Sequence, residues 1–129
     1  MHITRRRPDT RRGPAENSTG TVWLDGTAAP PVPSRPRVFP VHFAPGAHTA
    51  WHRHPNGRVP HVLEDEGLVR RSGGEVKQIR AGDTVWIEPD TWHRHGAGPR
   101  TFMTHLAVVE AAADGTTTEW HAHVTDHPA

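Results

Sequence analysis

The sequence predicts an all-β fold, a sandwich or barrel built from short strands. Hydrophobic residues make up only 33% of the chain, which contains 12 glycines and 13 prolines, and this composition favours many turns over long helices. Strand-like segments also alternate with turn residues at short spacing, which is typical of sandwiches and barrels. Because 129 residues can bury one core but not two, we expect a single domain.

The N-terminal segment 1–18 is expected to be a basic, flexible arm, with the single domain covering residues 19–129. The arm carries arginines at positions 5–7 and 11–12, and Pro8 and Pro14 disfavour regular structure in it. A basic run without aromatic residues to stack on bases is weak support for nucleic-acid binding. We therefore expect a solvated arm and no nucleic-acid partner.

Eight strand candidates follow the arm. The prolines between residues 28 and 36 predict an extended linker without ladder hydrogen bonds. Asn56-Gly57 predicts a tight turn, residues 64–67 predict another turn, and residues 72–75 predict the turn of a hairpin. In chain order the expected strands are residues 21–25, 38–44, 48–52, 59–63, 68–71, 76–79, 84–87 and 102–109.

Two clusters of the form Trp-His-Arg-His, at residues 51–54 and 92–95, carry the functional signal. Alternate residues of an extended chain share a face, so the two histidines of each cluster point the same way. Two such pairs can converge on one ion, and neutral imidazole binds Mn, Fe, Co, Ni, Cu and Zn. A chance His-x-His is also common in a chain with 12 histidines, and the turn and strand before each pair favour the metal site.

The residues around these clusters resemble the two motifs of the cupin superfamily, because Gly46 precedes His52 and Gly82-Asp83 with Pro89 precedes His93. The resemblance implies the cupin fold, a double-stranded β-helix or jelly-roll β-sandwich barrel, over nearly the whole chain. The motifs are closest to those of small bacterial cupins similar to manganese-dependent hydroxynitrile (mandelonitrile) lyases. The segments that carry this closer likeness are WHRHPNG (51–57), IRAGDTVWI (79–87), HRHGA (93–97) and MTH (103–105).

The resemblance implies metal ligands at His52, His54 and His93, and two further pocket histidines, His95 and His105. The implied cofactor is one divalent transition metal, manganese first, with iron, nickel, cobalt or zinc as alternatives. Imidazole titrates near neutral pH, so His95 and His105 suit the catalytic acid and base roles that hydroxynitrile cleavage needs. Either could instead be a structural histidine, hydrogen-bonded in a small core.

Arg58 stands where the lyase-like members carry a fourth ligand, usually Gln, and where most cupins carry Glu or His. A guanidinium has no lone pair to give a cation, so Arg58 cannot be a ligand. It could clamp a substrate carboxylate beside the metal, or weaken metal binding by repulsion. A bulge at Pro60 could turn His61 inward as a replacement ligand. Arg58 could also turn to the rim and pair with an acid such as Glu64, Glu66 or Glu110.

The remaining pocket residues are expected to be mostly apolar. Phe39 and Val41 should line the pocket floor, and Trp92 should narrow its mouth. An apolar cavity with few polar groups suits a small aromatic or aliphatic molecule. The predicted substrate pocket comprises Arg58, Phe39, Val41, Trp92, Met103 and Val109.

Three functions stay open, because cupins include several enzyme classes and binding proteins. The first is a metal-dependent enzyme acting on a small organic substrate, with cleavage or formation of a C–C bond of the hydroxynitrile-lyase type. The second is a three-His iron dioxygenase, since the site also resembles the three-His thiol dioxygenase cupins. The third is a non-catalytic cupin that binds a small ligand or a metal.

The composition and the strand edges also predict the cellular location of the protein and its partners. The chain has no cysteine, which excludes thiolate ligands and disulfides. No apolar run approaches the ~20 residues of a membrane span, and no signal-peptide pattern is present, so we expect a cytoplasmic protein without a membrane partner. A sheet edge at residues 21–25 and a tail at residues 118–124 predict pairing between subunits in a homodimer.

Overall fold

The computed structural model describes residues 1–5, 9–26 and 28–126. These residues form strands and turns but no helix, which confirms the predicted all-β class. The strands are β1 (Arg11–Arg12), β2 (Ser18–Thr19), β3 (Val22–Leu24), β4 (Pro36–Phe43), β5 (His48–Thr49), β6 (His52–Arg53), β7 (Arg58–Arg71), β8 (Lys77–Arg80), β9 (His93–Ala97), β10 (Met103–Glu110) and β11 (Glu119–Trp120).

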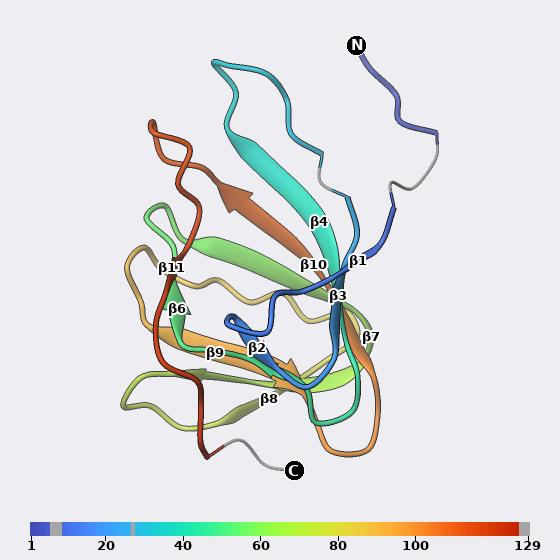
Figure 1. Cartoon of the computed structure of the whole chain (residues 1–129), viewed down its shortest axis with the longest axis vertical. Coiled ribbons are helices and arrows are strands. Elements are labelled where there is room, and N and C mark those ends of the chain that lie inside the picture. The colour runs from blue at the N-terminus through green and yellow to red at the C-terminus, as the bar shows by residue number, and fades with distance from the viewer. Residues whose placement is uncertain (6–8, 27, 127–129) are drawn as a thin grey trace.

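The strands form two antiparallel sheets that share the long strand β7. The first half of β7 pairs with β10, and the sheet continues through β4 and β3 to β1. The second half pairs with β8 and β9, and β9 continues to β5 and β6, which pair with β2 and β11. Figure 1 shows β4, β10 and β7 side by side, with β9 and β8 crossing the lower part of the fold.

A β-bulge lets β7 pass from one sheet to the other, and the turn predicted at residues 64–67 is wrong. Val62 pairs with His105 whereas Glu64 pairs with Thr104, so Leu63 is an extra residue in β7. Asp65, just beyond it, has a φ of 57°. A bulge bends a strand and increases its twist, so one continuous strand replaces the two predicted ones.

Regular structure also begins inside the predicted N-terminal arm, so the prediction of an irregular segment is wrong from Arg11 onward. β1 pairs with β3, and β2 pairs with β5. Pro14 is tolerated because it lies in the turn between β1 and β2, where its carbonyl accepts a hydrogen bond from the amide of Asn17. Arginines 6 and 7 and Pro8 of the predicted arm lie outside the described residues.

One expectation about strand edges is wrong. The proline-rich linker was expected to lack ladder bonds, yet Ala28 and Val38 exchange two backbone hydrogen bonds. Within one chain β3 is paired on both sides and β11 is paired with β6, and the expected pairing of these segments between subunits stays a prediction. The hairpin predicted around residues 72–75 is confirmed by the pairing of β7 with β8.

The core lies between the two sheets and reaches the histidine clusters. Phe43 is fully buried, and its ring lies 5.8 Å from that of His95 and 5.5 Å from that of His105, between centroids. The packed apolar cluster therefore forms one wall of the histidine site. Its buried members are Val22, Val41, Phe43, Ala47, Val62, Ile79, Ala97, Met103 and Ala107.

The close approach of β5 to β9 leaves no room for a side chain at Gly96. A Cβ there would lie 2.4 Å from the carbonyl oxygen of Ala47 and 2.5 Å from the Cβ of His48. We therefore expect Gly96→Ala to lower the free energy of unfolding by about 1–3 kcal/mol, because the strands must separate. Urea denaturation measures this, with Gly98→Ala as the control, since a Cβ at Gly98 meets nothing within 4 Å. Equal stability of the two variants would contradict this account of the strand contact.

Candidate metal centre

The antiparallel pairing of β6 with β9 brings the two histidine clusters together. His52 and His93 are register partners, and their ring centroids lie 4.2 Å apart. His54, two residues beyond His52, lies 5.1 Å from His52 and 5.2 Å from His93. All three side chains are at most 1% exposed. The alternation predicted from the sequence therefore places these histidines around one point.

Backbone carbonyls orient the same three rings. The Nδ1 atoms of His52, His54 and His93 lie 2.9, 2.9 and 2.8 Å from the carbonyl oxygens of residues 50, 117 and 91. A carbonyl only accepts hydrogen bonds, so each Nδ1 must carry the proton and each Nε2 must hold a lone pair. The three Nε2 atoms are buried and have no hydrogen-bond partner. Three fixed, unpaired imidazole nitrogens form a donor set that fits a transition-metal ion.

Burial also keeps these imidazoles in the neutral form that a metal requires. It lowers the pKa of His54 to about 3 and that of His93 to about 4, and it lowers the pKa of His52 well below its ordinary value. The positive charge of Arg58 lowers all three pKa values further. The rings are therefore neutral at neutral pH, with the proton on Nδ1 and none on Nε2.

Distance alone selects a different trio. One ring nitrogen each of His52, His93 and His95 lies within 4.8 Å of the other two, and His54 is outside this group. His95 was expected to act in catalysis rather than as a ligand, and neither of its ring nitrogens has a hydrogen-bond partner to fix its orientation. An oriented lone pair is the stronger mark of a ligand, so the carbonyl-bonded set, which includes His54, is the better candidate for the metal ligands. His95 lies beside that set.

His95 and His105 form a second pair deeper in the fold. Their ring centroids are 4.9 Å apart, and both side chains are at most 2% exposed. The ring nitrogens of His105 also have no hydrogen-bond partner. Burial, followed by nearby positive charge, lowers both pKa values. Both side chains are therefore neutral at neutral pH.

Arg58 lies inside the fold and not at its rim. Its backbone is fixed by two hydrogen bonds with Ile87, and its side chain is only 6% exposed. The guanidinium carbon lies 5.5 Å from the ring centroid of Phe39. Burial lowers the pKa of Arg58 to about 10, so the group stays charged at neutral pH. Within the described residues it has no ion pair, so the predicted pairing with a glutamate is wrong.

A cavity of about 400 Å³ opens beside this group. Phe39, Val41, Arg58 and His95 line it, as do residues 116–118 and Trp120 from the C-terminal segment. Trp120 also packs on His52, with ring centroids 4.6 Å apart. Sequence reasoning missed this wall, because the tail carries no motif beyond its run of threonines. The volume suits a small organic molecule.

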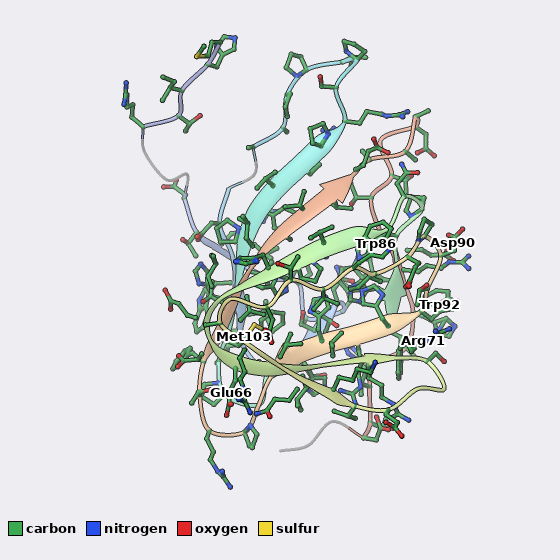
Figure 2. All side chains as sticks on the ribbon, turned by 180° about the vertical axis from the view of Figure 1, so that it is seen from behind. Glu66, Arg71, Trp86, Asp90, Trp92 and Met103 are labelled. Atoms are coloured by element: carbon green, nitrogen blue, oxygen red, sulfur yellow. The ribbon has the colours of Figure 1, made fainter. Side chains whose placement is uncertain are left out.

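Three predicted pocket residues lie elsewhere. Met103 and Val109 are buried but do not line the cavity, and Met103 belongs to the apolar core cluster instead. Trp92 points away from the site, and the guanidinium of Arg53 lies 4.6 Å above its ring. Figure 2 shows Met103 inside the fold and Trp92 at its edge near Arg71.

The replacement ligand suggested at His61 is also wrong. The Nδ1 atom of His61 lies 2.7 Å from the hydroxyl of Thr84, on the outer side of β7. Pro60 is buried and does not displace the strand here, because its carbonyl accepts a hydrogen bond from Val85. The bulge of β7 occurs at Leu63 instead.

The chain belongs to the cupin family, because residues 39–104 match the family model described as "Cupin domain". A curated relative, named (R)-mandelonitrile lyase, from Granulicella tundricola, is 46% identical over 115 residues, which cover 89% of this chain and 87% of that protein. The predicted resemblance to small cupins similar to such lyases is thereby confirmed.

Solved structures support the same fold. The crystal structure of a cupin-like protein from Thermotoga maritima matches with a TM-score of 0.82 and 28% identity, over 97% of this chain and 92% of that chain. A polyketide cyclase from Streptomyces resistomycificus matches with a TM-score of 0.75 over 99% of this chain and 90% of its own, but at 15% identity it shows the fold alone. Among the described residues, no helix is long and apolar enough to span a membrane.

The free energy of unfolding of the metal-free protein is expected to fall as the pH drops below about 6.5. The folded state keeps the buried histidines neutral because their pKa values are lowered, whereas the unfolded chain binds protons there. Each histidine contributes up to about 1.4 kcal/mol per pH unit between 6.5 and its lowered pKa.

Urea denaturation between about pH 7 and pH 5 measures this slope. His54→Gln, which removes one of the buried titrating groups, should show a shallower slope than the wild type. A free energy of unfolding that does not change over this range would mean that the histidines are not held neutral.

Proposed function

We propose that this chain is a metal-dependent cupin lyase that cleaves or forms a C–C bond in a small organic molecule of the hydroxynitrile type. The observation that carries the proposal is the set of three buried Nε2 atoms of His52, His54 and His93, each oriented by a backbone carbonyl. The relative named (R)-mandelonitrile lyase supports the reaction class. We propose one divalent transition metal as the cofactor, manganese first.

A divalent ion in this position supplies Lewis acidity toward a carbonyl, hydroxyl or cyano group of the substrate. The chain supplies the rest of the site. Phe39 and Val41 offer apolar contacts to the body of a substrate, and the tail residues around Trp120 also line the cavity. These contacts would hold the molecule next to His95.

The two unpaired histidines account for the proton transfers. In hydroxynitrile cleavage the substrate hydroxyl loses its proton to a neutral imidazole, and the electron pair of the breaking C–C bond leaves with cyanide. The products are an aldehyde or ketone and, after cyanide accepts a proton, hydrogen cyanide. His95 lines the cavity and suits the first proton transfer, and His105, beside it, suits the exchange of the proton between the two rings.

A second candidate is an iron-dependent dioxygenase, because the three-His site resembles that of three-His thiol dioxygenase cupins and imidazole also binds iron. Oxygen uptake that requires iron would support it, whereas cyanide release without oxygen uptake supports the lyase. A non-catalytic cupin would bind a small ligand without turnover in either assay. We also retain the expectation of a cytoplasmic homodimer, and sedimentation equilibrium measures its subunit number.

The variant His105→Ala is expected to lower kcat for cyanide release from mandelonitrile by about 10²–10⁴-fold while metal content stays at the wild-type level. The reason is that its imidazole contributes to proton transfer and is not one of the three oriented ligands. Colorimetric cyanide detection and elemental analysis measure the two quantities. His61→Ala is the control, because that histidine faces Thr84 on the outer side of β7. An unchanged kcat in the metal-loaded His105 variant would remove this residue from the mechanism.

A further inference from the structure

We propose that the substrate of this site carries a carboxylate, which Arg58 binds, so that the pocket prefers an anionic molecule over a neutral one of the same shape. The inference deepens the proposed function and rests on the cavity being the substrate site of that function. It concerns the chain's own departure at position 58, where a cationic side chain faces the cavity.

Arg58 is buried without a counter-ion. Its Nε atom has no hydrogen-bond partner, and within the described residues its side chain has no ion pair. Its guanidinium carbon lies 5.5 Å from the ring centroid of Phe39, and this aromatic contact supplies no counter-ion. A buried charge of this kind is costly unless something of opposite sign pairs with it. The guanidinium fork matches a carboxylate with two parallel hydrogen bonds.

The wall of the cavity carries positive charge. Arg11 and Arg37 line the same cavity as Arg58, and no aspartate or glutamate lies among the described residues that line it. Imidazole carries no negative charge in either protonation state, so the five histidines near Arg58 offer it no counter-charge. The net field in the cavity is positive, which concentrates small anions there.

The backbone of Arg58 is fixed by its neighbours. Its backbone amide donates to the carbonyl of Ile87 at 2.9 Å, and its own carbonyl accepts from the amide of Ile87 at 2.9 Å. It also pairs with Val109 of β10 in the β7–β10 ladder. Because the backbone is held on both sides and the side chain is buried, Arg58 loses less freedom when an anion binds than a mobile surface arginine does, so its contribution to affinity is larger.

Isothermal titration calorimetry with two matched probes tests the proposal. Benzoate and benzamide have nearly the same shape, and only benzoate is charged. We expect metal-free wild-type protein to bind benzoate at least about tenfold more tightly than benzamide, as a charge-assisted pair allows. Arg58→Gln should abolish this preference. Arg100→Gln, which removes an exposed arginine that does not line the cavity, should keep it.

Two results would overturn the proposal. One is wild-type protein that binds benzoate no better than benzamide, a measurement that does not depend on any variant folding. The other is a folded Arg58→Gln variant that keeps the full preference. Arg58→Lys provides a further check, because it keeps the charge but loses the fork, and it should show a reduced preference for benzoate.

Activity provides a second readout that links the inference to turnover. The ratio of kcat/KM for the cyanohydrin of 4-carboxybenzaldehyde to that for the cyanohydrin of benzaldehyde should exceed one in the wild type and fall at least about tenfold in Arg58→Gln. Absence of cyanide release from both substrates would defeat the proposed lyase, yet the calorimetry on metal-free protein would still decide the role of Arg58. Conversely, cyanide release with no carboxylate preference would keep the lyase and reject the carboxylate site.

Discussion

The pairing of β6 with β9 is the constraint on which the site depends. His52 and His93 come from distant parts of the chain, and they meet because they are opposite each other in one antiparallel ladder. β9 is itself held by β7 on one side and by β5 on the other, with Gly96 allowing β5 to approach closely. The rigid sheet, rather than a loop, thus fixes the distances between the imidazoles, as a preorganised site requires.

The interior of this fold contains groups that favour ions of opposite charge. Buried Nε2 lone pairs from three histidines favour a cation, whereas the buried guanidinium of Arg58 favours an anion. The positive charge of Arg58 lowers the pKa of the three imidazoles, and it would repel a metal ion bound to them. A metal ion and an anionic substrate bound together would satisfy both, which connects the proposed reaction with the proposed substrate class.

Strand alternation and turn residues were enough to predict the fold class, the hairpin and the convergence of the histidine pairs, because these depend on local periodicity. The bulge at Leu63 was not predictable, since nothing in the local pattern marks one extra residue in a long strand. The inward position of Phe39 and Val41 followed from alternation, whereas Trp92 was misplaced because its partners, Arg53 and His121, come from other segments. The carbonyls that orient the histidines could not be predicted from the sequence either, because any residue can supply a backbone oxygen.

Elemental analysis of purified, tag-free protein tests the proposed metal centre most directly. We expect about one equivalent of manganese or another divalent transition metal in the wild type and in the control His61→Ala, and none in a His52→Ala/His93→Ala double variant. A wild-type protein that holds no metal even after reconstitution with manganese, iron, nickel, cobalt and zinc would contradict the account. In that case the charge of Arg58 would have turned a metal site into a binding pocket for a small molecule.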